Sequence, residues 1–206
     1  PVKFDKFKED ILEVMDIKSA KIRWEGTIAS VVEQLDIKYS NMFFGEIWKP
    51  QTDEYSYTGW QLVDEVKKLN PRAVLDVGCG YNQFKERIPN LIGIDPYNNQ
   101  ADYEVDILEY KVKPESHDVI LALGSINFNS KDEIEARFSH CINLLKKGGK
   151  FYLRANPGIT HKTGPYVEIF PWTFEVVNEF AEKYNLKLDT FKKDANDRLY
   201  FVYTKL

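Results

Sequence analysis

The sequence predicts an α/β fold built on a mostly parallel sheet. Apolar runs too short to be helices, beginning with residues 74–77, alternate with segments of helical periodicity. Gly78 ends the first run, and an acid stands at the end of each of the first two runs, Asp76 and Asp95. Asp95 follows Asp76 by about 20 residues, a spacing at which a second strand end can present a carboxylate to ribose hydroxyls. The two acids and the glycine turn predict a nucleotide-type ligand site at the carboxyl edge of the sheet.

The length of 206 residues indicates a single domain with a small N-terminal extension. Apolar residues recur at helical spacing in residues 4–17 and 28–35, and residues 40–57 are rich in aromatic side chains. We therefore expect a helical and aromatic cap over residues 1–57 and an α/β core over residues 58–206.

The first half of the core is expected to alternate strands with helices. A helix begins near Thr58 and stops at Asn70, because the residue before Pro71 is displaced from the helical region. Another helix is expected between the glycine turn and the second strand. The predicted strands of this half comprise residues 74–77, 91–94, 102–106 and 117–123.

The second half contains a clear helix-start signal at Ser130, because Glu133 completes a capping box. The inner face of this helix is expected to carry Ile134, Phe138, Cys141, Ile142 and Leu145, and Gly148-Gly149 should terminate it. We expect next a strand over 150–155 and a surface loop over 156–165. A helix with Pro171 in its first turn should then reach about Tyr184, and two strands should follow it, over 186–191 and 198–204.

Composition narrows the classes of function. The net charge of −4 gives no sign of the basic surface typical of nucleic-acid-binding proteins. Two cysteines indicate a reducing, cytoplasmic setting rather than a disulfide framework, and with three scattered histidines they argue against a zinc site, so no metal is expected. No apolar run is long enough to span a membrane, and the N-terminus lacks a signal-peptide core.

The glycine turn distinguishes between kinds of cofactor. Gly78 and Gly80 let the backbone turn sharply and approach a ligand closely. The dinucleotide-binding fingerprint requires a third glycine, and this chain has Gln83 at that position. A dinucleotide site is therefore disfavoured.

The segment Asp76-Val77-Gly78-Cys79-Gly80 resembles motif I of the class I S-adenosylmethionine (SAM) methyltransferases. The resemblance covers roughly residues 58–206. It implies a Rossmann-like, seven-stranded, mostly parallel sheet with strand order 3-2-1-4-5-7-6, and SAM as the cofactor. Many family members have a further glycine where this chain has Asn82, a residue that tolerates turn geometries well.

The resemblance also implies roles for particular residues. Asp76, Gly78, Cys79 and Gly80 would surround the methionine part of SAM, and Asp95 with Pro96 would lie at the ribose. Asp106 would accept a hydrogen bond from the adenine amine, with a loop-capping role as the alternative and Asp102 as a competing acid. The remaining residues implied at the cofactor are Ile107 against the adenine ring, and Leu123 and Gly124 beneath the methionine part.

The acceptor side is less well defined by the sequence. Asn127 is a catalytic candidate on this side, with turn capping as the alternative, and Phe128 follows it where several family members have histidine. Tyr57 and Trp60 are candidates for a lid or substrate wall, although aromatic residues at such density commonly pack in a core. His161 is a second weak catalytic candidate, and Arg154 is expected to pair with a surface carboxylate rather than with an anionic substrate.

Several related activities lack their signatures. The Asp/Asn/Ser-Pro-Pro-aromatic motif of enzymes that methylate amino groups of DNA bases is absent after the fourth predicted strand, as is the Pro-Cys nucleophile of cytosine C5 enzymes. Aminopropyl transfer would need polyamine-binding acids in residues 123–128, which contain none. The sequence therefore favours a SAM-dependent methyltransferase acting on a small molecule or a terminal group. The alternatives are a non-catalytic SAM-binding or regulatory protein and an RNA or protein methyltransferase.

Overall fold

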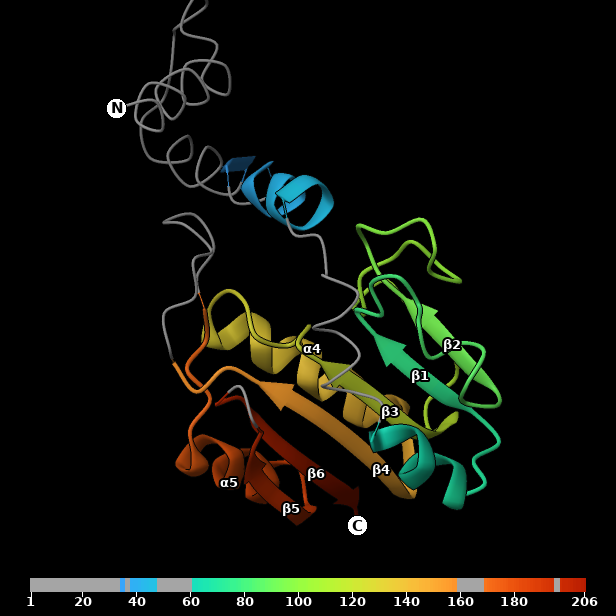
Figure 1. Ribbon diagram of the computed structural model, residues 1–206. Coiled ribbons are helices and arrows are strands. Elements are labelled where there is room, and N and C mark those ends of the chain that lie inside the picture. Colours follow the sequence, from blue (N-terminus) through green and yellow to red (C-terminus); the bar gives the residue numbers. More distant parts are fainter. Residues whose placement is uncertain (1–33, 36–37, 48–60, 159–168, 195–196) are drawn as a thin grey trace, which may run out of the picture. The chain divides into compact units, whose positions relative to one another are not determined.

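The computed structural model describes residues 34–35, 38–47, 61–158, 169–194 and 197–206 (Figure 1). The chain divides into two compact units. The first comprises Pro1–Lys49 with Thr163–Val167, and the second comprises Pro50–Lys162 with Glu168–Leu206. Every described residue of the candidate site lies in the second unit.

The second unit is built on a six-stranded sheet with the order β2-β1-β3-β4-β6-β5. Strands β1 to β4 are parallel, and β6 pairs antiparallel with both β4 and β5. The carboxyl ends of β1 to β4 therefore share one edge, which we call the carboxyl edge. The strands are β1 (Val74–Val77), β2 (Leu91–Ile94), β3 (His117–Leu123), β4 (Leu145–Ala155), β5 (Leu186–Lys193) and β6 (Leu199–Lys205).

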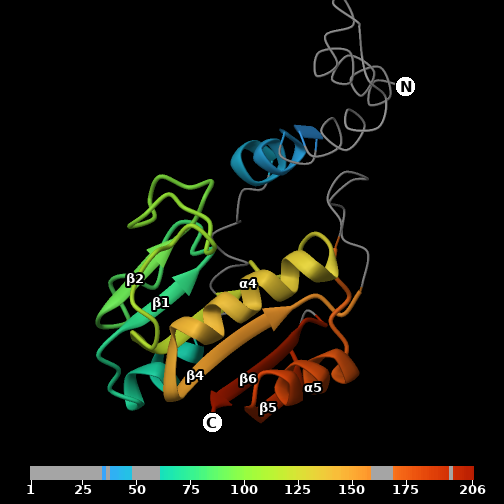
Figure 2. The ribbon, with the colours of Figure 1, turned by 180° about the vertical axis from the view of Figure 1, so that it is seen from behind.

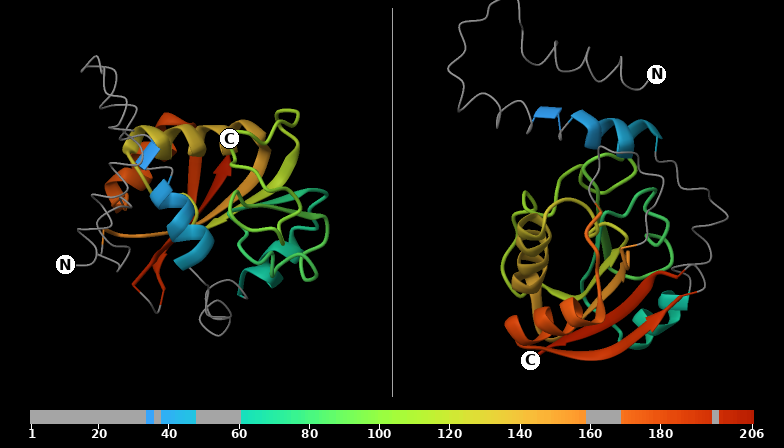
Figure 3. Two further views of the ribbon diagram at one scale, coloured as in Figure 1. Left: turned by 90° about the horizontal axis from the view of Figure 1, so that it is seen from above. Right: turned by 90° about the vertical axis from the view of Figure 1, so that its left-hand side faces the viewer.

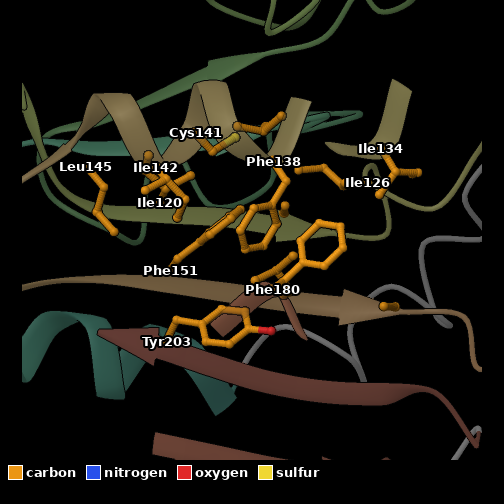
Figure 4. Packing of buried hydrophobic residues seen from close by; sticks show 14 of the residues in the cluster. Ile120, Ile126, Ile134, Phe138, Cys141, Ile142, Leu145, Phe151, Phe180 and Tyr203 are labelled. Atoms are coloured by element: carbon orange, nitrogen blue, oxygen red, sulfur yellow. The ribbon is translucent and has the colours of Figure 1, made fainter. Parts of the chain in front are cut away.

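Helices α4 (Lys131–Leu144) and α5 (Phe174–Lys183) cover one face of this sheet, as the view from behind shows (Figure 2). Phe138 of α4 is fully buried at the centre of a cluster of aromatic rings (Figure 4). Its ring centroid lies 4.8 Å from that of Phe180 in α5 and 5.3 Å from that of Phe151 in β4. Such tilted and edge-on pairs stabilise a core beyond the burial of their area.

The helix over residues 61–68 lies on the opposite face of the sheet (Figure 3, right). Leu62, Val63 and Val66 are its buried side chains, and they pack with residues of β1, β3, β4 and β6. The helix ends where Asn70 adopts a left-handed conformation before Pro71, as the sequence predicted. The two faces together bury the sheet from which the carboxyl-edge loops project.

Two elements expected between the strands do not form. Residues 81–87 make consecutive turns instead of a helix, because Asn82 adopts a left-handed φ of 53° and Pro89 follows, which leaves too short a segment for two helical turns. The expected strand over 102–106 reduces to a single parallel bridge between Ile94 and Tyr103. The sheet therefore has six strands rather than seven, with the order of the other six as predicted.

Two boundaries also differ from the prediction. Helix α4 opens with the predicted capping box, but it ends at Leu144 rather than at Gly148-Gly149. Leu145 is the C-cap and already has extended backbone, so β4 begins five residues earlier than expected. Helix α5 begins after Thr173, whose hydroxyl accepts a hydrogen bond from the Val176 N–H, and Pro171 precedes the helix.

In the first unit, the described residues are helical over 34–35 and 38–42, followed by the π-helix η2 (Phe43–Ile47). The rings of Phe43 and Phe44 pack edge to face at 4.9 Å. The predicted helix over 4–17, most of that over 28–35, and residues 48–57 lie outside the described residues. In the part of the chain that the structure describes, no helix has the length and apolar character needed to cross a membrane.

Candidate functional site

Asp76, near the end of β1, is a buried carboxyl group without a hydrogen-bond partner among the described residues. Only 3% of its surface is exposed. Burial, followed by the nearby charge of Asp95, raises the pKa of Asp76 to about 7. A buried polar group without a partner is costly to stability, so the site is arranged to receive a hydrogen-bond donor, preferably a cationic one.

Gly78 forms the turn immediately after β1. Its φ of 68° lies in the left-handed region that favours glycine, and its N–H donates to the Ile94 carbonyl at 2.8 Å. A Cβ atom at this position would overlap the side chain of Ser125, and the Ser125 hydroxyl donates to the Val77 carbonyl. The turn after β1 and the loop after β3 are thus in contact, which leaves no room for a side chain between them.

Asp95 fixes the other side of the glycine turn. One carboxylate oxygen accepts from the Gly80 N–H at 2.9 Å, and the other accepts from the Tyr97 N–H at 2.8 Å. Burial raises the pKa of Asp95, and these backbone donors oppose that rise. Since an ionised carboxylate can accept about four hydrogen bonds, Asp95 retains acceptor capacity for a ligand hydroxyl. Pro96, the next residue, is exposed.

Cys79 and Asn82 fill the space beside Gly93 of β2. A Cβ atom on Gly93 would overlap the Asn82 amide oxygen and lie 2.8 Å from the Cys79 sulfur. The Asn82 amide nitrogen donates to the Gln100 carbonyl at 3.1 Å. Burial raises the pKa of the Cys79 thiol, so it stays protonated and has a packing role in this turn.

Asp102 and Asp106 both have structural partners. The Asp102 carboxylate accepts from the Gly93 N–H at 2.8 Å and forms an ion pair with Lys85 at 2.8 Å. One Asp106 oxygen accepts from the Leu108 N–H at 2.9 Å, which is a loop-capping contact, and the other pairs with Arg137 Nε at 3.2 Å. Ile107, the residue expected against an adenine ring, is 3% exposed and packs in the core.

Leu123, the last residue of β3, is partly buried, and the loop that follows it crosses the same edge. Gly124 has a φ of 116°, and its carbonyl accepts from the Asn127 amide nitrogen at 3.0 Å. The Asn127 amide oxygen accepts from the Asn156 N–H at 2.9 Å, just beyond β4. The amide nitrogen of the buried Asn127 side chain thus closes its own loop, and the amide oxygen ties that loop to the end of β4, which matches the capping alternative more closely than a catalytic role.

Phe128 pairs with Ile169 in an isolated antiparallel bridge, which places its backbone beside the chain that follows the loop after β4. Arg154, at the end of β4, pairs with Asp194 at 2.6 Å, as the sequence predicted for a surface carboxylate. Tyr57, Trp60 and His161 lie outside the described residues.

The structure thus brings Asp76, Gly78, Cys79, Gly80 and Asp95 together at the ends of β1 and β2. Sequence reasoning missed Ser125, Gly93 and Asn156, which shape the loops around them. Gly93 stands inside an apolar strand, a position where glycine indicates close approach of another segment, so a signal for it was present. Ser125 and Asn156 act through contacts between segments distant in the sequence, and no local pattern identifies them.

Solved structures of SAM-dependent methyltransferases share this fold. The chain is similar to the 1,6-didemethyltoxoflavin-N1-methyltransferase of Burkholderia thailandensis, solved with 1,6-didemethyltoxoflavin and S-adenosylhomocysteine (TM-score 0.62, 14% identity, 91% of this chain and 92% of that one). It is also similar to the magnesium protoporphyrin IX methyltransferase of Synechocystis PCC 6803, solved with SAM (TM-score 0.57, 11% identity, 91% and 100%). A SAM-dependent methyltransferase of Archaeoglobus fulgidus matches with a TM-score of 0.54 and 14% identity over 70% and 93% of the two chains.

No protein-family model matches the sequence, and no curated protein sequence does. The likeness therefore rests on structure, and it shows the fold: this chain has the Rossmann-like fold of the class I SAM-dependent methyltransferases. Its departures are the absence of the third strand and of the helix after β1.

Proposed function

We propose that this protein is a SAM-dependent methyltransferase whose acceptor is a small molecule or a terminal group on a larger one. The observation that carries the proposal is the buried carboxyl group of Asp76, which has no partner among the described residues and lies beside the glycine turn fixed by Asp95. A hydrogen-bond donor would satisfy this buried acid, and a cationic donor would do so best because it also stabilises the ionised carboxylate.

The residues at the carboxyl edge fit the parts of SAM. Asp76 would hold the ammonium of the methionine part, and Asp95 would accept hydrogen bonds from the ribose hydroxyls. Gly78 and Gly80 would let the backbone lie against the methionine part, because neither residue carries a side chain. Asp106 and Ile107 remain proposed adenine contacts, and for Asp106 this would add to its contacts with Leu108 and Arg137.

The proposed chemistry asks little of the protein beyond geometry. When bound, SAM supplies an activated methyl group on its sulfonium. The chain would hold the acceptor in line with that group, and favourable positioning supplies up to roughly 7–11 kcal/mol of a reaction barrier. The loop after β3 would act as a positioning element, because Asn127 ties it to the end of β4 at 2.9 Å.

A small acceptor is supported by the charge of the chain and by one structural neighbour. The net charge of −4 gives no general attraction for nucleic acid. The Burkholderia thailandensis enzyme was solved with a small heteroaromatic molecule. Tyr57, Trp60 and Phe128 remain the residues proposed at the acceptor side, and the division into an N-terminal cap over 1–57 and a core over 58–206 remains part of the proposal.

Calorimetric titration with SAM and with S-adenosylhomocysteine tests this function. We expect micromolar binding of both by the wild type and at least a tenfold loss in Asp95→Ala, because the two hydrogen bonds that the ribose hydroxyls would donate to the charged carboxylate would be lost. The Asp95→Asn side chain keeps one oxygen that can accept from the Gly80 N–H, so the turn should stay intact in this variant. Comparison with Asp95→Ala therefore separates loss of the ligand contact from collapse of the turn.

Asp64→Ala is the matched control, because Asp64 is an exposed acid on the helix over 61–68 and away from the carboxyl edge. It should bind SAM as the wild type does. Absence of SAM binding in a wild-type protein with the circular dichroism of a folded α/β domain would contradict the proposal. Binding without turnover on any acceptor would favour the regulatory alternative.

A further inference from the structure

We propose that Arg154 and Arg198 form a subsite at the carboxyl edge that binds a carboxylate or phosphate group on the methyl acceptor. This inference rests on the proposed function for its physiological ligand, and it names the chemical class of that ligand. The subsite lies at the end of β4 and in the turn between β5 and β6.

Register places the two arginines on the same face of the sheet. Arg154 of β4 is paired directly with Tyr200 of β6. Because side chains alternate along a strand, position 198 continues the face of Tyr200, and Arg198 becomes the diagonal neighbour of Arg154. Diagonal neighbours across an antiparallel pair lie within reach of long side chains.

One carboxylate contacts both residues, but it forms an ion pair with only one of the two guanidinium groups. Asp194 Oδ2 pairs with Arg154 Nε at 2.6 Å, and Asp194 Oδ1 accepts from the Arg198 backbone N–H at 3.0 Å. The Arg198 guanidinium itself has no ion-pair or hydrogen-bond partner among the residues that the structure describes. Asp197, in the same turn, is exposed and pairs with neither arginine in this described part of the chain. Of the charged pairs that the structure describes here, Asp194 with Arg154 is therefore matched, and the Arg198 guanidinium is left without an ion-pair partner.

This unpaired charge is held away from water. The Arg154 side chain is 15% exposed, and Arg198 is partly buried. Burial and then the charge of Arg154 lower the pKa of Arg198, although an arginine remains protonated at neutral pH. A second anion between the guanidinium groups would relieve both effects. Planar guanidinium groups bind carboxylate and phosphate oxygens through paired hydrogen bonds, so two neighbouring arginines favour an anion of this class.

The subsite lies where an acceptor would extend from the proposed cofactor position. The proposed cofactor contacts follow the strand order towards β4. They run from Asp95 after β2, through the glycine turn after β1, to Gly124 after β3. Arg154 is paired with Leu123, the residue before Gly124, so it lies one strand further along this edge. Adjacent strands are about 4.8 Å apart, a step that a small acceptor spans.

Titration of the full-length protein with sodium phosphate and, separately, sodium acetate at constant ionic strength tests the subsite. The readout is the NMR signal of the arginine Nε–H groups, assigned with the variants. We expect millimolar binding by the wild type and about a tenfold or greater loss in Arg198→Gln, because a charged donor pair is removed. Arg72→Gln is the matched control, since Arg72 is an exposed arginine before β1, at the opposite edge.

Asp194→Asn should change anion affinity in the opposite direction to Arg198→Gln. Its amide oxygen can still accept from the Arg198 N–H, while the competing negative charge is removed, so phosphate should bind about fivefold more tightly. Stronger binding of phosphate than of acetate would identify a phosphorylated acceptor, and the reverse order would identify a carboxylic acid.

The proposal is overturned if neither anion binds the wild type at up to about 50 mM. Equal binding by the wild type, Arg198→Gln and Asp194→Asn would also overturn it. Each of these results is independent of SAM, because Arg198→Gln should keep wild-type SAM affinity and Asp95→Ala should keep anion binding. Failure of the subsite can therefore be distinguished from failure of the proposed function.

Discussion

In the proposed site, the buried carboxyl group of Asp76 would make ligand binding depend on pH. Its pKa of about 7 means that the group is about half ionised at neutral pH. If the ammonium of SAM binds the carboxylate, affinity should rise about fivefold between pH 6 and pH 7, because the ionised fraction of Asp76 rises by that factor while the ammonium stays mostly protonated. Calorimetric titration of the wild type and Asp76→Asn across this range checks the prediction. The variant should bind weakly with little pH dependence, and a parallel rise in both proteins would contradict it.

The carboxyl group of Asp76 also makes the stability of the fold depend on pH. Between pH 3.8, the ordinary pKa of an aspartate, and about pH 7, the folded state holds a proton on Asp76, whereas the unfolded state has released it. The contribution of Asp76 to stability is therefore present at low pH and is lost as pH rises through about 7. Asp76→Asn removes this loss, so its free energy of unfolding should increase relative to the wild type between pH 4 and pH 8. Denaturant unfolding at several pH values measures that difference.

At the scale of an element, the turn after β1 depends on the absence of a side chain at Gly78. Gly78 and Gly148 both have left-handed φ angles, of 68° and 75°. Alanine at Gly148 would meet open space, whereas alanine at Gly78 would overlap Ser125. Gly148→Ala should therefore cost about 1–2 kcal/mol from backbone strain alone, and Gly78→Ala should cost about 1–3 kcal/mol more from overpacking.

Denaturant unfolding measures both costs, and calorimetry measures the effect on SAM affinity. Only Gly78→Ala should weaken SAM binding, because Gly148 lies within β4, away from the glycine turn. Equal stability losses in the two variants would show that Ser125 does not restrict the turn.

Elements whose signal is local could be predicted from the sequence. The capping box at Ser130 and the apolar run of β3 appear with the predicted start residues, because a cap and a buried strand depend on neighbouring residues. The predicted end of α4 was wrong, because Leu145 pairs with His117 in the sheet and the helix therefore stops before the termination signal at Gly148. The helix expected after Gly80 fails because the left-handed Asn82 uses residues that a helix would need.

The residues of the candidate site likewise fall into those that the sequence could predict and those that it could not. The acids and glycines of the turn could be identified because they follow strand ends in the sequence. The function of Asn127 as a clamp could not, because its partner Asn156 lies 29 residues away and reaches it only through the parallel pairing of β3 with β4. Arg198 was missed for a similar reason, since only the register of β4 with β6 places it beside Arg154.

At the scale of the whole molecule, the sheet order assigns positions to two ligands. The ends of β2, β1 and β3 carry the proposed SAM contacts, and the end of β4 with the turn before β6 carries the proposed anion subsite. The methyl group would then be transferred above β3 and β4, where Asn127 joins the two loops. In this arrangement cofactor and acceptor meet at one edge of a single sheet, and the described core positions both.

A crystal structure of the complex with S-adenosylhomocysteine tests this account most directly. We predict that the ribose hydroxyls lie within hydrogen-bond distance of Asp95, and that the amino group lies within hydrogen-bond distance of Asp76. The ligand sulfur should point towards the loop after β3. A ligand bound away from the carboxyl edge, or a bound ligand that leaves Asp76 without a partner, would contradict the account.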